Sequence, residues 1–173
     1  GYEEFMYVVR VRNSENSFLS LAYVGDLAGS SVALNEHGIA FSGNSILRGS
    51  QLGVPKSIIL RSQIMARSLE EFAELAVFSP RMIPNYTMAI DSFGNVMSVE
   101  AALHGASVLK MCAPYVHTNH LIHHPNLEEL ERGVTRSSII RLLDAEKYLA
   151  RRGSGEILLK NTLKSHGPAY SIC

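Results

Sequence analysis

The sequence is poor in cysteine, in net charge and in long apolar runs. Among its 173 residues it has only two cysteines, Cys112 and Cys173, too few for a disulfide scaffold. Its sixteen basic residues equal its sixteen acidic ones, so it lacks the basic excess of a typical nucleic-acid binder. No run reaches the roughly eighteen apolar residues of a membrane-spanning helix, and no signal peptide is visible. We therefore expect a cytoplasmic protein that binds neither nucleic acid nor membrane.

The common catalytic and nucleotide-binding motifs are also missing. There is no G-x-G-x-x-G, no Walker phosphate loop, no G-x-S-x-G nucleophile elbow and no C-x-x-C. These absences disfavour nucleotide binding and the commonest hydrolase fold.

What is present is an ordinary globular composition, with 46% hydrophobic and 18% charged residues. The length predicts a single domain over residues 1–173. The sequence does not begin with Met. We interpret it as a piece of a longer protein, incomplete at both ends.

The hydrophobic period changes along the chain. A period of two predicts antiparallel strands in the first third, and a helical period of about 3.6 begins near Val54-Pro55. Ser68, with Glu71 three residues later, forms a capping box. We expect one sheet to include residues 5–12, 18–24, 31–34 and 39–44, with helices at about 55–66 and 68–78 packed side by side on its outer face. Later strands are expected at 86–90, 96–100, 108–111 and 115–118, and helices at about 137–151 and 154–164. Segregated blocks of this kind indicate the α+β class with antiparallel sheets.

Four histidines form the most conspicuous polar cluster. His117, His120, His123 and His124 fall within eight residues, and several imidazoles can converge on a metal ion. Their spacing is not that of H-E-x-x-H, and no acidic residue stands between them. We expect a metal-free polar loop, with a metal-dependent hydrolase as the alternative.

The two cysteines do not look like nucleophiles by themselves. Cys112 follows an apolar run and is expected to be buried and inert, and nothing orients the terminal Cys173.

Four asparagines lie at or near strand ends, where a side-chain amide serves either as a turn residue or as an oxyanion donor. Turn chemistry suffices for Asn35, which is followed by Glu36-His37-Gly38. It suffices less well for Asn44 and Asn119, and composition alone leaves both interpretations open. The fourth is Asn85.

Several motifs, taken in order, resemble the penicillin acyltransferase family of N-terminal-nucleophile hydrolases. The most distinctive is the H-T-N-H of residues 117–120. The others are N-x-x-G through Asn44 in residues 35–44, Gly53-Val54-Pro55 followed by Arg61, the strand pair of residues 85–100 ending in Val99-Glu100, Ser137-Ser138 with Arg141, and the late S-x-C of residues 171–173.

The resemblance implies a fold and a chemistry. The fold is a four-layer αββα sandwich with antiparallel sheets, and the activity is that of an amidohydrolase or acyltransferase on a small acyl amide or thioester. A precursor cuts itself by autoproteolysis before a cysteine, whose α-amino group then serves as the base for its own thiol. No cofactor or metal is implied. Asn119 would be an oxyanion-hole donor and Asn44 a second polar group at the same centre, while Asn85, Thr118 and His120 are predicted to contact substrate.

The sequence departs from this family pattern at its ends. Residue 1 is Gly, and the family's Asn-x-x-Asp segment and the Arg after S-x-C are missing. We therefore expect an N-terminal segment outside this chain to carry the nucleophile, and the chain alone to be inactive. The alternative is a non-catalytic binding or partner subunit of the same fold. Sheet edges left exposed by the missing ends would favour a homo-oligomer.

Overall fold

The computed structural model describes residues 2–46, 49–111, 114–125 and 135–150, together with residues 156, 160, 163 and 164. After a 3₁₀ turn at Tyr2–Phe5, the described strands are β1 (Met6–Val11), β2 (Phe18–Tyr23), β3 (Ala33–Asn35), β4 (Ala40–Ser45), β5 (Asn85–Ile90), β6 (Val96–Ala101) and β7 (Ala106–Met111). The helices are α1 (Lys56–Gln63), α2 (Leu69–Ala76) and α4 (Arg136–Leu149).

The strands form a single antiparallel sheet of seven strands in the order β1 to β7, so each strand pairs with its neighbours in sequence. The predicted α+β class and the antiparallel pairing are confirmed. The strand predicted at residues 31–34 lies slightly later, at Ala33–Asn35. The described residues contain this one sheet, and a second sheet facing it is not seen among them.

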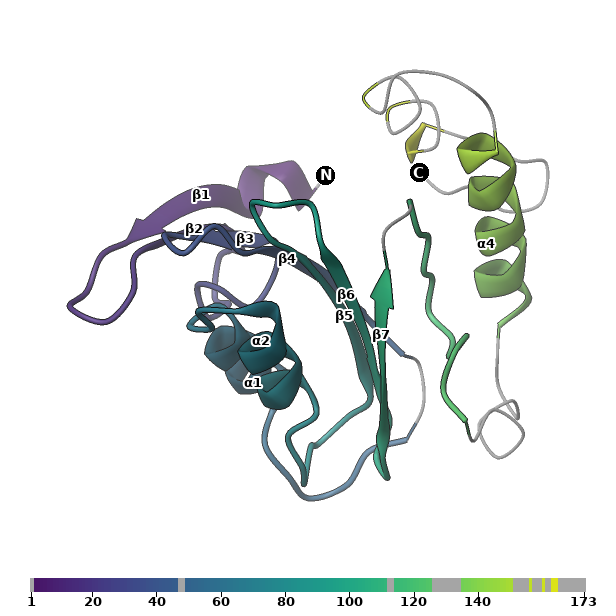
Figure 1. Ribbon diagram of the computed structural model, residues 1–173, viewed down its shortest axis with the longest axis horizontal. Coiled ribbons are helices and arrows are strands. Elements are labelled where there is room, and N and C mark those ends of the chain that lie inside the picture. Colours follow the sequence, from purple (N-terminus) through teal and green to yellow (C-terminus); the bar gives the residue numbers. More distant parts are fainter. Residues whose placement is uncertain are drawn as a thin grey trace.

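The strand predicted at residues 115–118 is wrong. Residues 114–118 have no strand pairing and run instead across the face of the sheet opposite α1 and α2 (Figure 1). The run Tyr115-Val116-His117-Thr118 is rich in aromatic and β-branched residues, which favour strands, but its side chains contact groups that project from the sheet. His117, for example, stacks on Tyr86 of β5.

The described elements stack in layers. Helices α1 and α2 lie side by side on one face of the sheet, as predicted, and the extended segment 114–125 crosses the other face (Figure 1). Helix α4 lies outside that segment and corresponds to the helix predicted at about 137–151. The helix predicted at 154–164 lies mostly outside the described residues.

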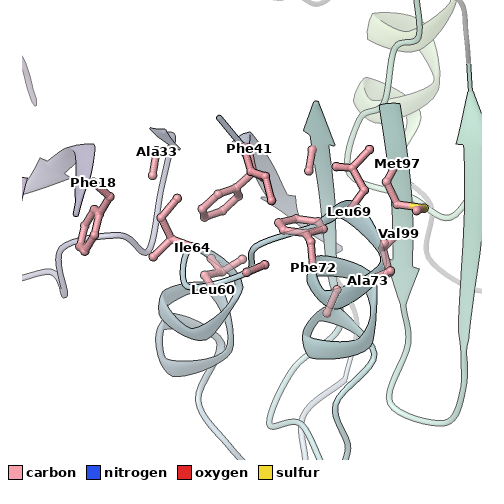
Figure 2. Packing of buried hydrophobic residues seen from close by; sticks show 14 residues of the cluster. Phe18, Ala33, Phe41, Leu60, Ile64, Leu69, Phe72, Ala73, Met97 and Val99 are labelled. Carbon is pink, nitrogen blue, oxygen red and sulfur yellow. The ribbon is translucent and has the colours of Figure 1, made fainter. Parts of the chain in front are cut away.

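The main core lies between the sheet and the α1–α2 pair (Figure 2). Phe72 of α2 is fully buried, and its ring centroid lies 5.6 Å from that of Phe41 in β4. Leu60 and Ile64, from α1 and the residue after it, fill the same layer beside Phe18. Large and small apolar side chains alternate here, which fixes α1 and α2 against the sheet.

The short helices are held by specific polar contacts at their ends. Ser68 caps α2 as predicted, because its side chain accepts a hydrogen bond from the backbone N–H of Glu71. Just after the C-terminal end of α1, Asn35 Nδ2 donates to the carbonyl oxygens of Ile64 and Ala66. Its Oδ1 accepts from the backbone N–H groups of His37 and Ile39. Asn35 is therefore a turn residue, as predicted, and also the residue that ties this turn to α1.

None of the described helices is long and apolar enough to cross a bilayer.

Candidate functional site

The candidate site lies where the end of β4 meets the segment 114–125. Asn44 Nδ2 donates to the carbonyl oxygen of Thr118 at 2.7 Å, across 74 positions of sequence. Asn119 Nδ2 donates to the carbonyl oxygen of Ser45 at 2.8 Å. The structure therefore brings together the two asparagines that the sequence singled out, and it uses their amides to join two distant parts of the chain.

Helix α4 holds Asn119 from the other side. Arg141 Nη2 donates to Asn119 Oδ1 at 2.7 Å, and the backbone N–H of Asn119 donates to Ser138 Oγ at 2.8 Å. Thr135 caps the first turn of this helix by accepting from the N–H of Ser138. The oxygen and the nitrogen of the Asn119 side chain are thus each oriented by a fixed partner.

Thr118 and His120 converge on the same serine. Ser138 is fully buried, and its hydroxyl lies 2.7 Å from His120 Nδ1 and 3.0 Å from Thr118 Oγ1. Thr118 also donates to the carbonyl oxygen of Ser138 at 3.0 Å. Burial is the main reason that the pKa of His120 lies below its ordinary value, which favours the neutral ring. In this geometry both side chains stabilise the loop that carries Asn119.

A buried carboxylate anchors the segment on the sheet. Glu100 of β6 is fully buried, and its side chain accepts hydrogen bonds from His117 Nε2 at 2.9 Å and from the backbone N–H groups of Ile122 and His123. Burial by itself would raise the pKa of Glu100, but the bonds from His117 and Ile122, with the nearby His123, lower it overall. The three donors flank Asn119 on both sides, so Glu100 fixes the path of the chain around it.

Further polar contacts surround this carboxylate. His123 lies between Ser107 Oγ at 2.8 Å and Ser98 Oγ at 3.1 Å, and Ser98 donates to the hydroxyl of Tyr86. The rings of Tyr86 and His117 stack with centroids 3.5 Å apart. Burial raises the pKa of Tyr86, and burial lowers that of His123. These groups link β5, β6 and β7 to the segment that crosses them.

Three histidines of the cluster make different hydrogen bonds. His117 binds Glu100, His120 binds Ser138, and His123 binds Ser98 and Ser107. In the part of the chain that the structure describes, no group of three or more His, Cys, Asp or Glu side chains could hold a metal ion. This arrangement gives no support to the metal-dependent hydrolase.

Asn85 lies on the opposite face of the sheet. In the β4–β5 register Asn44 is opposite Tyr86 and Ser45 is opposite Asn85, so Asn44 and Asn85 point to different faces. Asn85 is fully buried and accepts from Arg81 Nη1 at 3.0 Å, on the side covered by α1. The structure brings Asn44, Thr118, Asn119 and His120 together but not Asn85.

An apolar pocket of about 420 Å³ opens on the same face of the sheet as Asn44. Tyr115, four residues before Asn119, forms part of its wall, and burial raises the pKa of Tyr115 to about 12. The strands contribute Ala40, Ser42, Met88, Ile90 and Val96 to its lining, and Val32 just before β3 adds to it. An apolar group could therefore bind next to the segment that carries Asn119.

Comparison with known proteins decides the family. Residues 2–173 match the family described as acyl-coenzyme A:6-aminopenicillanic acid acyl-transferase. The chain belongs to this family. The match to the acyl-transferase family spans every described element, including the Asn44–Asn119 junction and α4. A search of curated proteins gave no match.

Three residues of the motifs have structural roles that the sequence did not predict. Glu100, Ser138 and Arg141 stood in the matched motifs without a role, yet all three hold the Asn119 segment. Glu100 had a usable signal, because an acidic residue inside the apolar run of residues 96–102 must find buried donors. Ser138 and Arg141 had none beyond their motif, since their partner is nineteen or more positions away. Cys112 and Cys173 lie outside the described residues.

Proposed function

We propose that the junction of Asn44 and Asn119 is the oxyanion-stabilising part of an enzyme that transfers or hydrolyses small acyl groups through a cysteine. The observation that supports this most is the orientation of Asn119. Its Oδ1 accepts from Arg141, so its Nδ2 must be the donor, and one of the two Nδ2 hydrogens is used by Ser45. A second amide hydrogen remains to be directed at a developing negative charge.

The proposed reaction has two half-steps. A cysteine thiolate attacks the carbonyl carbon of an amide or thioester, and the carbonyl oxygen becomes an oxyanion that accepts from Asn119. Collapse expels the amine or thiol with a proton and leaves an acyl-enzyme thioester. Water or a second amine then attacks this thioester, which releases the acid or a new amide and restores the thiol.

We propose that the nucleophile comes from a segment outside this sequence, whose N-terminal cysteine is freed by autoproteolysis. Its α-amino group, with an ordinary pKa of about 7.7–8.0, would take the thiol proton near neutral pH. The family match supports acyl transfer, and the cysteine mechanism is our inference from the resemblance.

The apolar pocket supports an apolar acyl group as the substrate. Its volume of about 420 Å³ fits a short aliphatic or aryl side chain, and its wall includes Tyr115 from the segment of Asn119. An acyl group held there would place its carbonyl toward the Asn44–Asn119 junction.

We also propose the complete four-layer sandwich. The described layers already follow the order helix, sheet, extended segment, helix (Figure 1). On the face opposite α1 and α2, and outside the apolar pocket, the strands β1 to β3 expose apolar side chains, which a second sheet would cover. These are Val8, Leu19 and Leu34.

The test is an assay of the 173-residue chain on a panel of acyl amides and thioesters, alone and with a cysteine-initiated segment supplied. Turnover only with the segment, abolished by thiol alkylation, is the expected result. Turnover by the chain alone that survives alkylation would refute the cysteine mechanism. Inactivity in both arms would favour a non-catalytic partner subunit.

A further inference from the structure

Asn119 is held by a cation on its carbonyl side. Arg141 Nη2 lies 2.7 Å from Asn119 Oδ1, on α4, while Asn119 Nδ2 donates to the Ser45 carbonyl. A guanidinium can only donate hydrogen bonds and a backbone carbonyl can only accept them. These two partners therefore admit one orientation of the amide and exclude its flipped form.

The guanidinium also acts on the electrons of the amide. A charged donor on Oδ1 draws electron density through the conjugated amide away from Nδ2, and linked hydrogen bonds strengthen one another in this way. The Nδ2 hydrogens thereby become better donors. Among the described residues Arg141 donates to Asn119 and Ser137 and forms no ion pair with a carboxylate.

The rest of α4 supports this contact. Thr135 caps the helix, and Ser138, one turn before Arg141, receives the backbone N–H of Asn119. One helix face thus fixes both the backbone and the side chain of the same residue. Arg136, on the same helix, is exposed and makes no contact of this kind in the described structure.

We infer that Arg141 is a positioning residue that fixes the Asn119 amide and polarises its N–H groups toward the reacting carbonyl oxygen. The expected effect of Arg141 on the reaction rate rests on the proposed function. The hydrogen bond between Arg141 and Asn119 can be measured without substrate. Arg141 does not touch the substrate in this account, so it acts on the transition state only through Asn119.

The first experiment is nuclear magnetic resonance of the 173-residue chain labelled with ¹⁵N. The Asn119 side-chain signal is assigned by its loss in Asn119→Ala. Arg141→Gln should move that signal, Arg141→Lys should move it less, and the control Arg136→Gln should leave it in place. An Asn119 signal that is unchanged in Arg141→Gln, in a spectrum that is otherwise folded, overturns the inference.

The second experiment measures kinetics of the same variants in the chain assembled with its cysteine-initiated segment. Arg141→Gln should lower kcat by roughly 10–100-fold, the equivalent of one charge-assisted hydrogen bond, with KM little changed. Arg141→Lys should recover part of the rate. A raised KM with unchanged kcat would show direct substrate binding and would overturn the positioning role. If Asn119→Ala itself leaves kcat unchanged, the proposed function fails, and the nuclear magnetic resonance result still decides the contact.

Discussion

Asn44 and Asn119 each bind the backbone carbonyl beside the other: Asn44 donates to Thr118, and Asn119 donates to Ser45. This reciprocal pair joins the end of β4 to the loop before α4. It predicts that the two side chains act as one unit. Asn44→Ala should lower the free energy of unfolding by about 1–2 kcal/mol, because it removes one partly buried hydrogen bond. Asn119→Ala should lower it further, because it removes the bonds to both Ser45 and Arg141.

Since both bonds close the same junction, the double variant should lose less than the sum of the two single losses. Denaturant unfolding of the four proteins measures this. Strict additivity would show that the two amides act independently.

Glu100 should contribute strongly to stability. Glu100→Gln keeps the size of the side chain but replaces one carboxylate oxygen with an NH₂ group. The NH₂ group cannot accept hydrogen bonds, so at least one buried donor loses its acceptor. We expect a loss of about 2–4 kcal/mol in the free energy of unfolding. The control is Glu70→Gln, whose ion pair with Lys110 is exposed and should matter little. An equal effect of the two substitutions would contradict the role of Glu100 as an anchor.

The pH dependence of stability follows from three lowered pKa values. His120 and His123 have pKa values below 6.5, and Glu100 has one below 4.5. For each group the unfolded chain therefore binds the proton more readily, so the free energy of unfolding should fall as the pH falls. The decline should begin near pH 6.5 through the histidines and steepen below pH 4.5 through Glu100. Denaturant unfolding at a series of pH values checks this, and stability that rises between neutral and pH 5 would contradict it.

The core beneath α2 provides a packing test. Phe72 is fully buried against Phe41, so Phe72→Ala should cost about 3–5 kcal/mol by leaving a cavity. Phe93, which is 89% exposed in the β5–β6 turn, offers the matched control. Thermal unfolding should show a large decrease in Tm for Phe72→Ala and little change for Phe93→Ala. Similar decreases would mean that the α1–α2 layer is not the main core.

The local pattern of the sequence predicted most elements but not how they meet. The sequence patterns predicted all seven described strands, and the Ser68 capping box located the start of α2, because both signals depend on neighbouring residues. Residues 115–118 are also rich in aromatic and β-branched residues, yet they cross the sheet face instead of pairing. What decides between the two is the partner of each side chain, such as Tyr86 for His117, and that partner is far away in sequence.

The candidate site shows the same limit. The family resemblance selected Asn44 and Asn119, and the structure places them together. It also selected Asn85, whose place in the strand register puts it on the other face. A motif match does not show to which face of the sheet a side chain points, because that depends on the register between strands. It therefore could not distinguish Asn85 from Asn44.

The most direct test of the account is the rate of Asn119→Ala in the chain assembled with its cysteine-initiated segment. If Asn119 stabilises the oxyanion, kcat should fall by roughly 10²–10³-fold while KM changes little. The control is Asn95→Ala, in the exposed β5–β6 turn, which should keep the full rate. An unchanged kcat in a folded Asn119→Ala protein would contradict the assignment of this junction as the active site.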